Sequence, residues 1–174
     1  MNEQTLTRLW GMRLAFGVIV CTILFFHLLP LETTPRRLVG PDLVLAFAFA
    51  WSLRRPEYVP APALAGLFLL TDLLLLRPPG LWAALALLAS ENLKSRARSL
   101  RDGGFANEWL TACILMVFVA VTYRLLLMVT FVDLPPFGLS VFELVATMLS
   151  YPLVVAVTHG LLGVHKAAPG DLDT

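Results

Sequence analysis

Apolar stretches separated by short polar segments follow one another along almost the whole chain. They lie at roughly residues 14–31, 38–53, 61–76, 80–93, 109–132 and 137–163. A hydrocarbon core of ~30 Å needs about 20 residues of helix to cross it, and backbone polar groups inside lipid must be paired within the segment. The pattern therefore predicts an all-α integral membrane protein, a bundle of about six transmembrane helices.

The middle segments are short for this purpose. The second, third and fourth offer only about 14 to 16 residues each against the roughly 20 that a crossing needs. The third and fourth are joined by Arg77-Pro78-Pro79-Gly80, a turn compatible with two full crossings or with a re-entrant hairpin. We expect a cytoplasmic N-terminus at 1–13, one transmembrane domain at 14–163 and a disordered cytoplasmic tail at 164–174.

Composition supports the membrane assignment. Apolar residues make up 58% of the 174 residues and charged residues 14%, and the mean hydropathy is +0.79, values outside the range of soluble domains. The spans and turns use nearly all of the chain, which argues against a separate extramembrane domain. The four tryptophans fall near span ends, where an amphipathic ring is favoured: Trp10, Trp51, Trp82 and Trp109.

Positive charge is segregated to one side of this six-span topology. Of the 13 Lys and Arg residues, nine share a side: Arg8, Arg13, Arg54, Arg55, Lys94, Arg96, Arg98, Arg101 and Lys166. Basic loops stay in the cytoplasm, which places both termini there. Segregation by side also argues against nucleic acid as a partner. The basic loop Lys94, Arg96, Arg98 and Arg101 is expected to contact anionic membrane lipids, with docking of a cytoplasmic protein as the alternative.

Four ionisable residues lie inside the predicted spans. From the outer span ends, at ~1.5 Å per residue, His27 and Asp72 lie about 6 Å deep, Glu143 about 9 Å and Arg124 about 12 Å. Such residues are costly in lipid and mark candidate sites. Arg124 is expected to pair with Asp72 or Glu143 and to fix helix packing. A groove for a partner helix or solute, and proton-relay or hydrolytic chemistry, remain as alternatives.

Signatures of enzymes and cofactor sites are absent from the sequence. There is no H-E-x-x-H, Cys/His cluster, G-x-S-x-G or phosphate-binding glycine loop. We therefore predict no catalytic residue, no cofactor and no metal. Recognition within the membrane would use small residues that allow helices to approach closely: Ala46, Ala48, Ala50, or Ala61, Ala65 and Gly66.

Residues 40–93 carry a series of short motifs. In order they are Pro41-Asp42, Arg54-Arg55-Pro56-Glu57, Gly66, Asp72-Leu73 and Pro79-Gly80. Through them the chain resembles the bacterial rod shape-determining protein MreD family, whose length and span count it matches. It departs from the family after Asp72, where Leu74-Leu75-Leu76-Arg77 replaces small polar residues.

The resemblance implies a non-enzymatic subunit of the machinery that elongates the lateral cell wall in the bacterial inner membrane. The implied partner is MreC, and through it the MreB filaments, the glycosyltransferase RodA and the elongation-specific transpeptidase. The family is also likened to the substrate-binding subunits of vitamin uptake transporters. A solute-binding transporter subunit is therefore the alternative, although a shared fold does not by itself confer solute binding.

Overall fold

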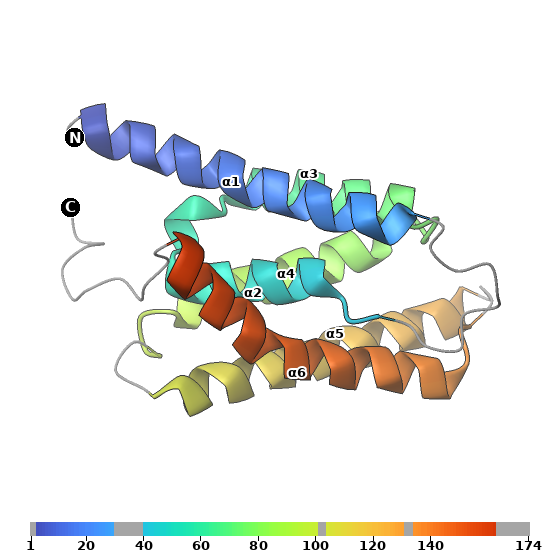
Figure 1. Cartoon of the computed structure of the whole chain (residues 1–174). Coiled ribbons are helices and arrows are strands. Elements are labelled where there is room, and N and C mark those ends of the chain that lie inside the picture. The colour runs from blue at the N-terminus through green and yellow to red at the C-terminus, as the bar shows by residue number, and fades with distance from the viewer. Residues whose placement is uncertain (1–2, 30–39, 101–103, 131–133, 163–174) are drawn as a thin grey trace.

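The computed structural model describes residues 3–29, 40–100, 104–130 and 134–162 (Figure 1). Six α-helices account for most of these residues. They are α1 (Glu3–Leu28), α2 (Leu43–Arg54), α3 (Ala61–Leu74), α4 (Leu81–Arg96), α5 (Phe105–Val129) and α6 (Phe137–Leu162), with the 3₁₀ helix η1 (Pro56–Tyr58) after α2. The predicted all-α class is confirmed.

The helices form three layers of two (Figure 1). α1 and α3 make one outer layer, α2 and α4 the middle layer, and α5 and α6 the other outer layer. Successive helices run in alternating directions. We call the side on which α2 ends and α5 begins the Arg54 end, and the side on which α2 begins and α3 ends the Asp42 end.

Three helices are long and apolar enough to cross a membrane. They cover Leu6–Leu28, Phe105–Val129 and Phe137–Gly160, while Leu43–Arg54 and Ala61–Leu74 are shorter apolar helices. The protein is thus a multi-pass membrane protein by its apolar helices. α1 begins at Glu3, so residues 3–13, predicted as the cytoplasmic N-terminus, belong to the same helix as the first apolar segment. The predicted tail at 164–174 lies outside the described residues.

The long helices are apolar on opposite faces. On α5 the side chains of Leu110, Ile114 and Phe118 are exposed at a spacing of four residues, while Ala112 and Met116 are buried. A helix that is hydrophobic all round is suited to a membrane. The exposed stripe is therefore the surface that lipid covers, and the buried stripe packs on the bundle.

The middle helix α2 forms the core of the bundle. Ten of its 12 residues are buried, and it packs against α1, α4, α5 and α6. Ala46, Ala48 and Ala50 are completely inaccessible, which lets the neighbouring backbones approach. This corrects the expectation that these alanines face a separate partner, because the bundle itself already covers them.

Burial in the core also changes the roles of two tryptophans. Trp51 is fully buried, with its ring centroid 5.2 Å from that of Phe16 and 6.1 Å from that of Tyr58. Trp82 is buried too, with its centroid 5.3 Å from the Phe68 centroid. Both rings lie near the ends of α2 and α4, as predicted, but they face the inside of the bundle, because sequence position along a span does not reveal which way a side chain faces.

Candidate functional site

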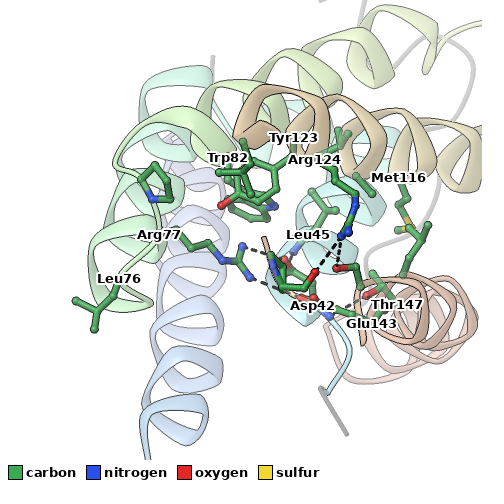
Figure 2. Close-up of a pocket in the computed structure, with 17 residues that line it drawn as sticks. Asp42, Leu45, Leu76, Arg77, Trp82, Met116, Tyr123, Arg124, Glu143 and Thr147 are labelled. Carbon is green, nitrogen blue, oxygen red and sulfur yellow. Dashed lines mark hydrogen bonds and ion pairs between the residues drawn. The ribbon is translucent and has the colours of Figure 1, made fainter. Parts of the chain in front are cut away.

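A cavity of about 340 Å³ opens at the Asp42 end between α2, α5, α6 and the turn from α3 to α4 (Figure 2). Its walls combine apolar side chains with a small set of charged and hydroxyl groups, the usual make-up of a ligand site. The polar members are Asp42, Arg77, Tyr123, Arg124, Ser140, Glu143 and Thr147.

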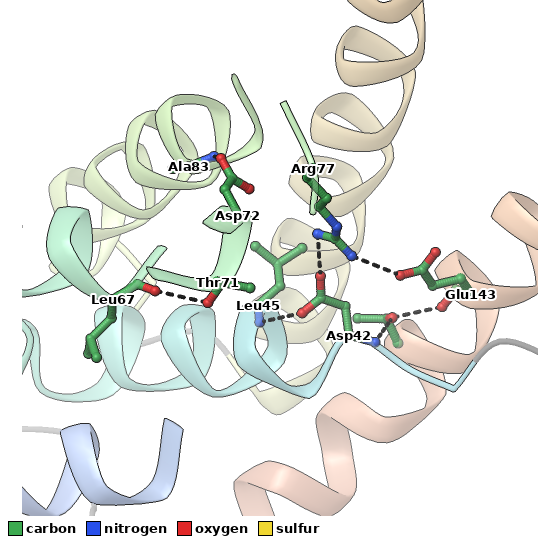
Figure 3. Close-up of polar contacts among 9 residues, drawn as sticks. Asp42, Leu45, Leu67, Thr71, Asp72, Arg77, Ala83 and Glu143 are labelled. Carbon is green, nitrogen blue, oxygen red and sulfur yellow. Dashed lines mark hydrogen bonds and ion pairs between the residues drawn. The ribbon is translucent and has the colours of Figure 1, made fainter. Parts of the chain in front are cut away.

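Three of these side chains form the ion triad Asp42, Arg77 and Glu143 (Figure 3). Arg77 Nη1 lies 3.7 Å from Asp42 Oδ2, and its Nη2 lies 3.6 Å from Glu143 Oε1. The three side chains are 12–31% exposed. One guanidinium thus faces two carboxylates from two other helices, at distances slightly beyond direct hydrogen bonding.

Asp42 holds its place because it begins α2. Its Oδ1 accepts a hydrogen bond from the Leu45 backbone N–H at 3.0 Å, the usual N-cap arrangement. The Asp42 backbone N–H donates to Thr147 Oγ1 at 2.8 Å, and that hydroxyl donates to the Glu143 carbonyl at 2.7 Å. The N-cap residue of α2 is therefore bound to α6 one helical turn after Glu143.

Arg77 is aimed by the end of α3. The Arg77 backbone N–H donates to the Asp72 carbonyl at 3.0 Å, and Leu76 adopts a left-handed conformation with φ of 54°. This pattern is a helix C-cap in which glycine normally occupies the left-handed position. The guanidinium then lies 5.0 Å from the centroid of the Trp82 ring, a cation–π contact.

Asp72 does not belong to the triad, and its side chain binds the backbone where the turn from α3 to α4 ends. Its Oδ2 accepts hydrogen bonds from the backbone N–H groups of Gly80 at 2.9 Å and Ala83 at 3.1 Å. The side chain is completely buried, and a carboxylate at the first turn of α4 also complements the helix dipole. Asp72 is thus a cap supplied by α3 to α4, and the expected pairing with Arg124 does not occur.

Arg124 lines the cavity on the side opposite Leu76 (Figure 2). Its Nη1 donates to the Pro135 carbonyl at 3.2 Å and to Ser140 Oγ at 3.3 Å, and its guanidinium carbon lies 5.2 Å from the Phe137 ring centroid. Within the described parts of the chain it makes no ion pair. The expected pair with Glu143 is replaced by the pair between Glu143 and Arg77.

Another cavity, of about 330 Å³, lies between α1, α2 and α3. His27 lines this cavity and does not line the first one. All three members of the ion triad line both cavities. The structure therefore divides the four predicted intramembrane residues: Arg124 and His27 line different cavities, Glu143 lines both, and Asp72 lines neither.

At the Arg54 end a buried clamp joins α2, α5 and α6. Arg54 Nε and Nη2 donate to the two oxygens of Glu108 at 2.9 and 3.3 Å, and the Tyr151 hydroxyl donates to Glu108 Oε1 at 3.2 Å. The Arg54 and Glu108 side chains are 9% and 1% exposed. Sequence reasoning placed both residues in loops. Glu108, Ala112 and Met116 are spaced four residues apart and are all buried. This spacing is the sequence signal that could have placed Glu108 on the inner face of α5.

Basic residues gather at the Arg54 end, as the charge pattern predicted. Lys94 donates to the Val59 carbonyl and pairs with Glu91, and Arg13 donates to the Glu57 carbonyl. Arg96 and Arg98 are exposed, and Arg101 lies outside the described residues. The predicted basic loop is thus partly structured, because α4 extends to Arg96 and Lys94 folds back on the bundle.

The remaining motif positions are now placed. Pro41 precedes the cap of α2, and Gly80 occupies a left-handed conformation with φ of 85° in the turn that follows Pro79. Gly66 differs, because it is exposed on α3 and a Cβ added there would meet no atom within 4 Å. The fold accounts for Asp42, Asp72 and Gly80, and leaves Gly66 without a structural role.

The described residues contain no group of three His, Cys, Asp or Glu side chains placed to hold a metal ion. The site instead offers two arginines, two carboxylates and three hydroxyl groups around the cavity. Comparison of the chain with protein-family models, curated proteins and solved structures finds no match.

Proposed function

We propose that the protein is a non-enzymatic scaffold subunit of the bacterial inner membrane, of the MreD kind. It binds MreC and, through MreC, acts with MreB, RodA and the elongation-specific transpeptidase in lateral peptidoglycan synthesis and cell shape. The observation that carries the proposal is that the buried charged side chains bind groups of the same chain. Arg54, Glu108, Asp42, Arg77 and Asp72 all bind other helices or backbone groups of the same chain.

This use of charge favours a scaffold over an enzyme. General acid–base chemistry needs titratable groups directed at a bound substrate with protonation states set apart. Here Glu108 accepts two hydrogen bonds from Arg54 and one from Tyr151, and Asp72 accepts two from the backbone. Polar groups that join five helices in this way, α2 to α6, give a fixed framework on which other membrane proteins can assemble.

The orientation and span number belong to the same proposal. Basic residues at the Arg54 end support a cytoplasmic location for that end and for both termini. α3 and α4 are about 21 and 24 Å long at ~1.5 Å per residue, and both run between the two ends of the bundle. We infer six membrane crossings, with the short helices α2, α3 and α4 enclosed in part by the longer ones.

The surface proposed to bind MreC is the outward face of α3. Pro62, Ala63, Gly66, Leu70 and Leu73 are exposed on it at spacings of one, three, four and three residues. Small side chains on a lipid-facing helix allow a second helix to approach closely. The single transmembrane helix of MreC would lie along this face, with Gly66 at the point of closest approach.

Gly66→Leu tests this interface. The added side chain meets no neighbour in the fold, but it would hold a partner helix away. We expect about a tenfold loss of co-purified MreC, equivalent to ~1.4 kcal/mol, and rounded cells when the variant replaces the wild-type protein. The measurement is the MreC to scaffold ratio after affinity purification from membranes.

Gly138→Leu is the matched control, since Gly138 is also exposed with no atom within 4 Å of an added Cβ, but lies on α6. Its MreC ratio should equal that of the wild type. Equal thermal unfolding of both variants would show that the bundle is intact. If Gly66→Leu retains full MreC binding, the α3 interface is wrong, and if the wild type binds no MreC, the scaffold proposal fails.

The cavity at the Asp42 end supports one second candidate, a solute-binding subunit of a transporter. Its volume of about 340 Å³ falls within the range of small-molecule sites, and it has convergent polar groups. This candidate predicts thermal stabilisation of the purified protein by a specific solute, which a scaffold does not predict.

A further inference from the structure

Arg124 differs from Arg54 and Arg77 in having no carboxylate partner among the residues that the structure describes. It lies five residues before the end of α5 at Val129, about 7.5 Å along the helix at ~1.5 Å per residue. A cation at that depth is costly unless something neutralises it. Among the described residues its Nη1 donates to one carbonyl and one hydroxyl, and Nε and Nη2 keep donors for a further group.

The rest of the cavity limits what that group can be. Asp42 and Glu143 already face Arg77, which lies between them, so a cation would find both carboxylates engaged. An anion is repelled least on the Arg124 side, where Ser140 and Tyr123 supply hydroxyl donors. Arg binds carboxylate and phosphate in a planar fork geometry, with charge-assisted hydrogen bonds.

The apolar walls indicate that the anion carries a hydrocarbon chain. Met116, Val119 and Leu144 line the cavity beside the polar groups. Leu76 lies at the edge of the set of lining residues and is 92% exposed (Figure 2). An exposed apolar side chain at this edge would let a hydrocarbon chain pass from the cavity into the bilayer.

We infer that this cavity binds an anionic amphiphile, whose phosphate or carboxylate head group contacts Arg124 and whose chain leaves past Leu76. The volume suits a head group and the start of a chain, with the remainder in the surrounding leaflet. The inference does not rest on MreC binding, and loss of MreC binding in the Gly66 variant would leave it intact.

The test uses the full-length protein in neutral detergent, titrated with dioctanoyl phosphatidylglycerol or dioctanoyl phosphatidylcholine and followed by native mass spectrometry. We expect the anionic lipid to bind about tenfold more tightly than the zwitterionic one. Arg124→Gln should abolish that preference. Arg98→Gln removes an exposed arginine at the Arg54 end and should retain it.

A second variant separates loss of the site from loss of the fold. Ala120 lines the cavity and is half-buried, so Ala120→Phe should fill the cavity and weaken phosphatidylglycerol binding with Arg124 still present. Equal binding of the two lipids by the wild type would overturn the inference. So would a preference that survives both cavity variants and disappears in Arg98→Gln, which would place the lipid at the basic end.

Inorganic phosphate distinguishes a lipid head group from a free anion. We expect phosphate at millimolar concentration to compete poorly with phosphatidylglycerol, because it makes no contact with Met116, Val119 or Leu144. If phosphate displaces all of the lipid when both are at the same concentration, the cavity is a site for free anions. That result would overturn the inference that it binds an amphiphile.

Discussion

Each end of α2 has an arginine paired with carboxylates from other helices, but the two groups differ in distance and in burial. At the Arg54 end, Arg54 and Glu108 meet at 2.9 Å in a clamp that is nearly inaccessible to solvent. At the Asp42 end, Arg77 stands 3.6–3.7 Å from two carboxylates beside a cavity, with its side chain 21% exposed. A buried, directly bonded pair fixes one packing, whereas a looser network leaves space and donors for a ligand.

Breaking the buried clamp should have the largest effect on stability. Glu108→Ala leaves the Arg54 guanidinium buried without its carboxylate, which typically costs about 3–5 kcal/mol. We expect that loss in the free energy of unfolding, measured by titrating the protein in mixed micelles with a denaturing detergent.

Glu91→Ala is the control for the clamp variant, because Glu91 pairs with Lys94 but is 44% exposed. An exposed pair contributes about 0–1 kcal/mol. If Glu108→Ala and Glu91→Ala destabilise the protein equally, the contrast between the clamp and surface pairs is wrong.

Removing the central cation of the triad should have an intermediate effect. Arg77→Met leaves Asp42 and Glu143 without their shared partner, but both carboxylates can be hydrated from the cavities. We expect a loss of about 1–2 kcal/mol of unfolding free energy, below that of a fully buried pair. The same micelle titration measures it.

Arg77→Lys separates charge from geometry, because lysine keeps the cation without the planar fork. It should recover part of the stability lost in Arg77→Met. A loss in Arg77→Met as large as that in Glu108→Ala would mean that the triad is as dry and as rigid as the clamp.

The smallest effect on stability is expected from a substitution in the turn that positions Arg77. Leu76 has a φ of 54°, a left-handed conformation that costs a residue with a Cβ about 1–2 kcal/mol. Leu76→Gly removes this strain, and after the entropy cost of glycine we expect a gain of about 0.5–1 kcal/mol. Thermal unfolding should detect it as a higher midpoint.

Leu75→Gly is the neighbouring control, since Leu75 has a φ of −90°, which any residue adopts. It should not stabilise the protein. Destabilisation by Leu76→Gly would show that the exposed Leu76 side chain contributes more than its backbone costs.

The sequence located the long helices well because their signal is local. The predicted segments 109–132 and 137–163 correspond to α5 (Phe105–Val129) and α6 (Phe137–Leu162). Hydrophobicity over some 20 residues is a property of the chain itself. The first helix begins at Glu3, eleven residues before the predicted apolar span, because hydrophobicity does not show how far a helix extends beyond its apolar segment.

Ion pairing could not be predicted in the same way. The sequence identified Arg124 and Glu143 as residues at similar depth, and depth follows from counting along each helix. It could not show that Arg77, assigned to a loop, would fold back to Glu143. That contact depends on the left-handed Leu76 and on how α3, α2 and α6 are rotated about their axes.

By itself, the sequence determined the membrane environment, the all-α class and the segregation of basic residues, because each follows from residue type and position along the chain. Tertiary structure alone decided that α2 is the core, that Asp72 is a cap and that Arg124 faces a cavity. These depend on which side of each helix meets its neighbours. When a helix is apolar on every face, the hydrophobic pattern does not indicate which face packs against other helices.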